Sequence, residues 1–237
     1  MKIGIIAAME EELALLVEQL DNALTTRFGR FSYHLGQIRG VEVALFLCGI
    51  GKVNAAVGTT LLLDRFRPDC LINTGVAGGF AQELEIGDVV ISSEACHYDA
   101  DATAFDYQMG QIPQMPPTYQ ADARLSRLAD KACLACEELV VHHGPILSGD
   151  SFVHAPEQIA AISEKFPDVM AVEMEGAAVA QTGFLFQVPF ILIRTISDKV
   201  RESGNSAVYA DCLKAAAENS VTIVLAMLDH IHGEPNA

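Results

Sequence analysis

Short apolar runs alternate along this chain with longer stretches in which apolar positions recur every three to four residues. The short runs are typical of buried strands, and the longer stretches are typical of helices with one face in the core. Strands are predicted at residues 2–8, 31–37, 41–47, 69–74, 87–93, 140–147, 169–172 and 190–193. Helices are predicted at residues 10–20, 52–66, 122–137, 156–166, 175–186 and 207–231.

This alternation predicts an α/β fold, a single-domain three-layer αβα sandwich with a central mixed β-sheet. An early hairpin is predicted because Ile38, Arg39 and Gly40 separate two strands. The segment GVAGG is interpreted as the turn that closes the strand at 69–74. Since no repeat or linker interrupts the pattern, residues 1–237 are expected to form one domain, with the last few residues disordered.

The composition favours a small-molecule ligand. A net charge of −16 disfavours nucleic acid and anionic membranes as partners. The chain starts with one lysine in a short apolar run, followed by three glutamates, so we expect no signal peptide and a cytoplasmic location. The six cysteines share no common spacing, and Cys133 and Cys136 form an isolated pair, so reduced thiols, no metal site and no cofactor are expected.

Carboxylates follow two of the predicted strands. Glu175 comes after the strand at 169–172, and Asp198 comes after the strand at 190–193. Ligands of open α/β sheets bind at the carboxyl ends of strands, so both side chains are expected in one cleft. Glu10, Glu11 and Glu12 open a helix, where carboxylates also complement the helix dipole. Glu12 is the candidate to turn into the cleft.

The loops near this cleft suit a flat ring better than a phosphate group. CGIGKVNAA lacks the residues of a phosphate-binding loop, and neither it nor TGVAGGF supplies an arginine. Phe152, in SGDSFVHAP, is placed to stack on an aromatic ligand, although a hydrophobic residue capping the core is an equally good interpretation. The irregular segment 97–119, with aromatic residues and three prolines, is predicted to be a binding or interface loop.

Seven motifs occur in order along the chain: KIGIIAAMEEE, GIGKVNAA, NTGVAGGF, DADATAF, SGDSFV, AVEMEGAAVA and RTISD. Together they resemble the bacterial 5′-methylthioadenosine/S-adenosylhomocysteine nucleosidases, from Met1 to about Leu228. The wider superfamily includes the purine nucleoside phosphorylases, so a nucleoside phosphorylase-like fold is implied. The resemblance also implies hydrolysis of the N-glycosidic bond of these nucleosides, which releases adenine in methionine salvage and the recycling of S-adenosylmethionine by-products.

The resemblance implies a role for each carboxylate. Asp198 would donate a proton to adenine N7, with Ser197 orienting it, and Glu12 would activate the attacking water. Glu175 would bind the ribose hydroxyls and stabilise a cationic ring. The family's substrate-binding positions match Ala8, Met9, Ile50, Val76, Gly78, Phe152, Val153, Glu173, Met174, Arg194, Ser197 and Tyr209.

The irregular loop of relatives reaches into the neighbouring subunit's site. By resemblance, Phe105, Tyr107 and Pro113 would close the alkylthio pocket of a partner, and a homodimer is expected. Val76 stands where several relatives carry serine. A futalosine-type hydrolase and a phosphate-dependent nucleoside phosphorylase on the same fold are alternative functions. A third is a nucleoside sensor without turnover, which would not need both an acid and a base.

Overall fold

The computed structural model describes residues 1–136, 138–202 and 205–233 of the chain. Its strands are β1 (Lys2–Ala7), β2 (Asp21–Phe28), β3 (Phe31–Ile38), β4 (Val41–Leu47), β5 (Cys70–Gly79), β6 (Val89–His97), β7 (Tyr119–Gln120), β8 (Val141–Ser148), β9 (Ala171–Glu173) and β10 (Phe190–Lys199). Its helices are α1 (Glu10–Glu18), α2 (Lys52–Phe66), α3 (Ala123–Leu134), α4 (Pro156–Lys165), α5 (Gly176–Phe186) and α6 (Asn205–Gly233), with a short 3₁₀ helix at Thr103–Phe105. None of the described helices has the length and apolar character needed to span a membrane.

The strands form one mixed sheet in the order β10-β6-β8-β9-β5-β1-β4-β3-β2, with β7 paired to β6. Ile3, Ile5 and Ile6 of β1 have no exposed surface, as expected for an interior strand covered on both faces. Strand β10 pairs with β5 as well as with β6, so β5, β9, β8, β6 and β10 form a closed circuit. This circuit brings the ends of strands that are distant in sequence close together.

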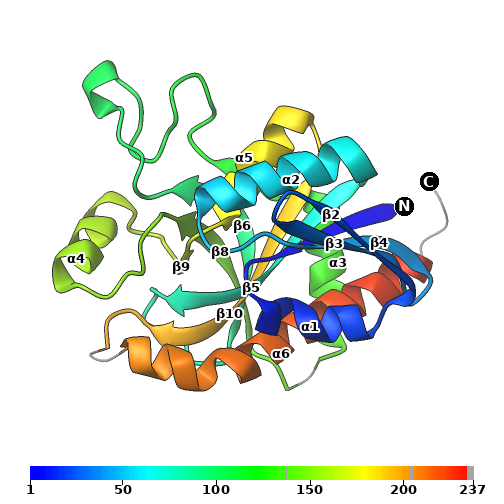
Figure 1. Ribbon diagram of the computed structural model, residues 1–237. Helices are drawn as coiled ribbons and strands as arrows, with labels where there is room; N and C mark the ends of the chain where they lie inside the picture. The colour runs from blue at the N-terminus through cyan, green and yellow to red at the C-terminus, as the bar shows by residue number, and fades with distance from the viewer. Residues whose placement is uncertain (137, 203–204, 234–237) are drawn as a thin grey trace.

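Helices cover both faces of the sheet (Figure 1). On one face, α1, α3 and α6 bury apolar residues against the sheet, and on the other face α2 and α5 do the same. Helix α4 lies beside a smaller apolar cluster, to which it contributes Ile162. The predicted three-layer α/β fold with a mixed sheet is therefore confirmed.

Strand β2 was not predicted from the sequence. It pairs with β3, so the predicted hairpin of β3 and β4 becomes a three-stranded antiparallel unit. Six of the eight residues of β2 are exposed and the other two are half-buried, because the strand lies at the edge of the sheet. Its sequence, DNALTTRF, lacks the apolar run that marks the buried strands.

Strands β5 and β10 continue beyond their predicted ends. The prediction that GVAGG forms a turn is wrong, since these residues extend β5 to Gly79. Gly78 pairs with Val172 of β9, and a Cβ on Gly78 would lie 2.7 Å from Val200 Cγ1. The missing side chain thus permits close packing within the circuit. Strand β10 includes Asp198, after a bulge between Ile196 and Asp198.

Several helix boundaries differ from the predictions. Helix α5 begins at Gly176, so Glu175 is its N-cap residue. Helix α3 ends at Leu134, and residue 137, the predicted end, lies outside the described part of the chain. The terminal residues 234–237, predicted to be disordered, also lie outside it. The loop between β6 and β7 extends away from the sheet, at the upper left of Figure 1.

Candidate active site

A cavity of about 290 Å³ lies where the ends of β1, β5, β9 and β10 meet. Residues from seven separate segments line it, so no single stretch of sequence forms the site. Its lining residues are Ala8, Met9, Glu12, Ile50, Val76, Ala77, Gly78, Phe152, Val172, Glu173, Met174, Glu175, Ser197, Asp198 and Tyr209.

Glu12 turns into this cavity from the first turn of α1. Its Oε2 accepts hydrogen bonds from the backbone of Ala8 at 2.8 Å and of Met9 at 3.0 Å, and its Oε1 accepts from Val76 at 3.0 Å. The bond from Met9 caps the helix, so Glu12 has a structural role as well. A carboxylate has about four lone-pair positions, so one position on Oε1 remains beyond these bonds. Burial raises the pKa of Glu12, against the lowering effect of Arg194.

Glu175 faces the same cavity from the N-cap of α5. Its Oε1 accepts a hydrogen bond from the Gly51 backbone at 2.7 Å, and its Oε2 lies 3.9 Å from Arg194 Nη2. Burial, reinforced by the nearby Glu173, raises the pKa of Glu175 to about 8. The side chain is only 4% exposed, yet Oε2 retains room for a hydroxyl donor.

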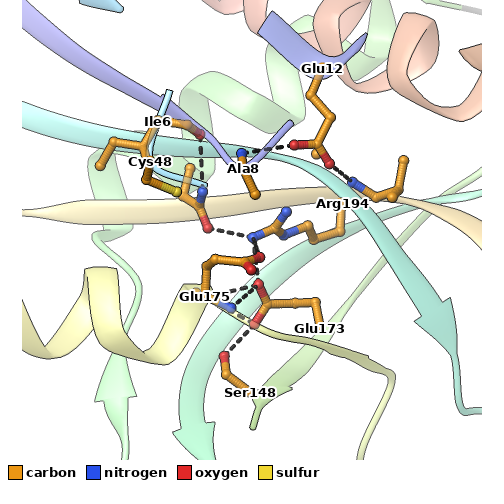
Figure 2. Close-up of polar contacts among 12 residues, drawn as sticks. Ile6, Ala8, Glu12, Cys48, Ser148, Glu173, Glu175 and Arg194 are labelled. Atoms are coloured by element: carbon orange, nitrogen blue, oxygen red, sulfur yellow. Dashed lines mark hydrogen bonds and ion pairs between the residues drawn. The ribbon is translucent and has the colours of Figure 1, made fainter. Parts of the chain in front are cut away.

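The carboxylate of Glu173 accepts hydrogen bonds from several other groups of the protein (Figure 2). Its carboxylate accepts from the Ser148 hydroxyl, from Arg194 Nη2 at 2.5 Å, and from the backbone of Glu175 at 3.0 Å and of Gly176 at 2.8 Å. These donors include the first N–H groups of α5, where a negative charge is favourable. The expected contact of Glu173 with substrate thus competes with four donors of the protein.

Arg194 lies directly behind the cavity and is 1% exposed. Burial lowers its pKa, but the surrounding Glu173, Glu175 and Glu12 outweigh this effect and raise it. The guanidinium therefore stays charged and partly neutralises the carboxylates. Figure 2 shows Arg194 between Glu12 on one side and Glu173 with Glu175 on the other.

Asp198 lines the same cavity, at the bulge of β10. It is 1% exposed, and its Oδ1 accepts from the Ser197 hydroxyl at 3.0 Å. Ser197 is itself within 3.3 Å of the Ala77 carbonyl. A bulge changes the direction of the side chains that follow it, and here it brings Asp198 to the cavity.

Aromatic side chains cover the part of the cavity near Asp198. Phe152 is 37% exposed and meets the Tyr209 ring edge to face at 5.6 Å. The Tyr209 hydroxyl donates to Met9 Sδ at 3.2 Å, and burial raises its pKa to about 12. Val153 lines a narrower continuation of the cavity together with Phe152 and Asp198. A flat ring would be stacked by Phe152 in this part of the site.

The three residues expected to serve a neighbouring subunit do not line this cavity. Phe105 is 76% exposed, Tyr107 is half-buried and Pro113 is exposed. Among the described residues, no group of three His, Cys, Asp or Glu side chains is arranged to hold a metal ion.

Some residues around the cavity were missed at the level of sequence. Ala77 and Val172 line it, while Ser148 and Asn73 hold Glu173 and Arg194 from behind. For Asn73 a signal was present, a polar residue inside the buried run CLINTG, because a buried amide needs partners. Ala77, Val172 and Ser148 also lie in strands, and their residue types do not mark them as residues of a site.

The fold and the cavity just described are those of one class of protein, and comparison with known proteins identifies that class. The model of the phosphorylase superfamily matches residues 2–229, so the chain belongs to that superfamily. Within it, the chain belongs to the 5′-methylthioadenosine/S-adenosylhomocysteine nucleosidases, which as nucleosidases are glycosidic hydrolases. The protein of this name from Maridesulfovibrio salexigens is 69% identical, over 98% of this chain and 100% of the relative. That from Bacillus subtilis is 44% identical over 98% of this chain and 100% of the relative.

Solved structures give the same result. The nucleosidase of Neisseria meningitidis, in complex with methylthio-immucillin-A, has a TM-score of 0.94 and 43% identity, over 97% of this chain and 99% of its own. The nucleosidase of Colwellia psychrerythraea, in complex with adenine, has a TM-score of 0.93 and 41% identity, over 96% and 94% of the two chains.

Proposed function

We propose that this enzyme hydrolyses the N-glycosidic bond of 5′-methylthioadenosine and S-adenosylhomocysteine and releases adenine. The observation that carries the proposal is the convergence of Glu12, Glu175 and Asp198, all buried, on one cavity with an aromatic wall. The names of close relatives, and the adenine or nucleoside-like ligands in the titles of similar structures, support this substrate class.

In this proposal Asp198 is the general acid. Cleavage of the bond leaves negative charge on adenine, and a proton delivered to N7 makes adenine a better leaving group. Ser197 donates to one oxygen of Asp198, which fixes the orientation of a carboxyl group that lines the cavity. Phe152 would stack on the base, and the backbone of Val153 would read its edge.

Glu12 is proposed to hold and activate the attacking water. Three backbone donors fix its carboxylate, and the remaining lone-pair position on Oε1 would accept a proton from that water. Arg194 supports this role because its charge favours the ionised form that a base requires. Water would then attack from the side of the ribose opposite to Asp198, as inversion at the sugar carbon demands.

Glu175 is proposed to bind the ribose hydroxyls and to stabilise the transition state. Its Oε2 is available to accept from them. As the sugar ring gains positive charge, the ionised carboxylate becomes favourable, so the interaction strengthens in the transition state. Ala8, Met9, Ile50, Val76, Gly78 and Met174 would line the ribose and base pocket, and Tyr209 its 5′ side.

The alternative function, phosphorolysis, needs a site for a phosphate dianion. Of the residues described as lining the cavity, none is lysine or arginine, and three are glutamates. Arg194 lies behind them with its Nη2 already bonded to Asn73 and Glu173. Water is therefore favoured over phosphate as the nucleophile.

Adenine release from 5′-methylthioadenosine, measured in phosphate-free buffer and again with phosphate, tests the proposal. We expect free adenine and free methylthioribose at the same rate in both buffers. Release only with phosphate, together with a sugar 1-phosphate, would identify a phosphorylase. Release from 6-amino-futalosine but not from 5′-methylthioadenosine would identify the futalosine-type alternative.

We also propose that the active form is a homodimer. Large apolar side chains are exposed near the start of α2 and at the end of α5, two helices that pack together. They are Ile50, Val53, Val57, Phe184, Leu185 and Phe186. A second copy would cover them and bring its Phe105 loop to the cavity. Light scattering at assay concentration should give the mass of two chains, and a monomer would contradict the proposal.

A further inference from the structure

Asn73 has no exposed surface and lies in the middle of β5, where an amide side chain is costly unless it is bonded. Its Nδ2 donates to the Ile6 carbonyl of β1 at 3.0 Å, and its Oδ1 accepts from Arg194 Nη2 at 2.6 Å. Asn73 thus links the strand that leads to Glu12 with the strand that carries Arg194.

Arg194 Nη2 is held between two acceptors, Asn73 Oδ1 and Glu173 Oε2. Because the guanidinium group is planar and rigid, fixing one terminal nitrogen also directs the other. That other nitrogen, Nη1, lies against Gly75, two residues beyond Asn73 and on the same face of β5. A Cβ on Gly75 would lie 2.5 Å from Glu12 Oε1 and closer still to Nη1, so Glu12 and Arg194 share the space that Gly75 leaves.

We propose that Asn73 is a positioning residue for the reaction, which holds Arg194 so that its charge lies between Glu12 and Glu175. This inference rests on the proposed function. The titratable groups that face Arg194 are Glu12 of α1, Glu173 of β9, Glu175 at the start of α5, and Cys48 after β4. Arg194 opposes the effect of burial on the pKa of Glu12. Displacing Arg194 would raise that pKa further and leave less ionised base at a given pH.

The test is the variant Asn73→Ala. We expect kcat to fall by about tenfold to a hundredfold, because small misplacements of a catalytic group are costly. The acid limb of kcat/KM should move to higher pH. Adenine should inhibit the variant with a Ki within about twofold of wild type, since Asn73 bonds to Ile6 and Arg194 and is not among the residues that line the cavity.

Two further variants separate positioning from folding. Asn73→Asp keeps the acceptor for Arg194 and loses the donor to Ile6, so it should recover most of the lost rate. Thr74→Val is the matched control, since Thr74 is equally buried, lies on the opposite face of β5, and has a hydroxyl without a described partner. Its kinetics should equal those of wild type. If Asn73→Ala does not fold, Asn73→Ser replaces it.

Three results would overturn the inference. The first is a wild-type kcat and pH profile in Asn73→Ala. The second is a rate for Asn73→Asp as low as that of Asn73→Ala. The third is an Asn73→Ala variant that loses rate and has a lowered Tm but shows no shift of the acid limb. A wild-type enzyme that releases no adenine would instead contradict the proposed function, so the two failures are distinguishable.

Discussion

Among single residues, the buried glutamates differ in how many of their acceptor positions the protein already uses. Glu12 and Glu175 each keep a position open toward the cavity, whereas Glu173 accepts from Ser148, Arg194 and the start of α5. All three are less than 9% exposed, so burial alone does not distinguish them. Glu12 and Glu175 are therefore suited to bind a ligand, and Glu173 is suited to hold the site together.

Asp198→Asn should abolish turnover while the fold is kept. The amide is nearly isosteric but has no acidic proton to deliver, and loss of a general acid costs about 10²- to 10⁴-fold in rate. Adenine release measures the rate, and a thermal melt within about two degrees of wild type reports an intact fold. A kcat within severalfold of wild type would rule out the general-acid role.

Glu12→Gln should stop hydrolysis and leave ligand binding nearly intact. The glutamine oxygen can still accept from the Ala8 and Met9 backbone, but the side chain can no longer take a proton from water. Calorimetric titration with 5′-methylthioadenosine measures binding. Glu11→Gln is the matched control, because Glu11 is in the same helical turn and is exposed. Unchanged turnover in Glu12→Gln would move the base to Glu10 or Glu11.

Glu175→Gln should stabilise the enzyme without ligand relative to wild type, and this gain in stability should be larger at pH 8 than at pH 5. The carboxyl of Glu175 titrates at about 8 in the folded chain against 4.5 when unperturbed. Between these values the folded state keeps a proton that the unfolded state loses, so stability falls as pH rises. Glutamine removes this effect, and a gain of about 2 kcal/mol would raise Tm by about 4–8 °C. The same Tm difference from wild type at both pH values would contradict the raised pKa.

Strand β10 and helix α5 each position a carboxylate of the site near one of their ends. The bulge in β10 directs Asp198 into the cavity, and the N-terminus of α5 is held by Glu173 and Ser148. Ser148 donates to Glu173 and accepts from the Ala177 N–H at 2.7 Å, so it acts as a cap supplied by another strand. The position of Glu175, at the start of that helix, depends on this cap.

Ser148→Ala should lower the free energy of unfolding by about 1–2 kcal/mol, the cost of a lost helix cap. The kinetic constants should change as well, since Ser148 bonds both to Glu173 and to the start of α5, where Glu175 lies. Denaturant unfolding measures the first effect. Ser126→Ala is the control, because the Ser126 hydroxyl donates to the carbonyl of Asp122, the N-cap residue of its own helix. Equal stability of the two variants would show that Ser148 is not an effective cap.

For the molecule as a whole, the closed circuit of strands makes the site, and the loop between β6 and β7 extends away from the sheet. The circuit brings β5, β9 and β10 together around the cavity. Phe105, on the protruding loop, is 76% exposed and does not line the cavity of its own chain. An exposed phenylalanine of this kind is consistent with a contact made in a partner subunit.

Phe105→Ala should raise KM for 5′-methylthioadenosine, with a smaller effect on kcat. Loss of a buried aromatic contact in binding typically costs about tenfold or more. A mixed dimer of one Phe105→Ala chain and one Asp198→Asn chain sharpens the test. If Phe105 acts in the partner, the site with intact Asp198 receives an intact Phe105, and its KM is that of wild type. A raised KM in the mixed dimer would mean that Phe105 serves its own chain.

Much of the fold followed from local pattern alone. Buried strands such as β1 and amphipathic helices such as α3 carry their periodicity in their own residues. Strand β2 and the extension of β5 do not, because the edge strand is polar and the extended part is rich in glycine. Both form strands only because a neighbouring strand supplies hydrogen bonds and, for β5, close packing.

For the site, residue types and motif order identified the family and placed Glu12, Glu175 and Asp198 on the list of candidates. The separate duties of Glu173 and Glu175, two residues apart, could not be read from the chain, since they depend on Ser148, Gly51 and Arg194 from distant segments. The same holds for Asn73, whose partners are Ile6 and Arg194. Hydrophobic periodicity is a local property and is written in the sequence. Burial, charge balance and hydrogen-bond partners arise only when distant segments meet, so tertiary structure decided them.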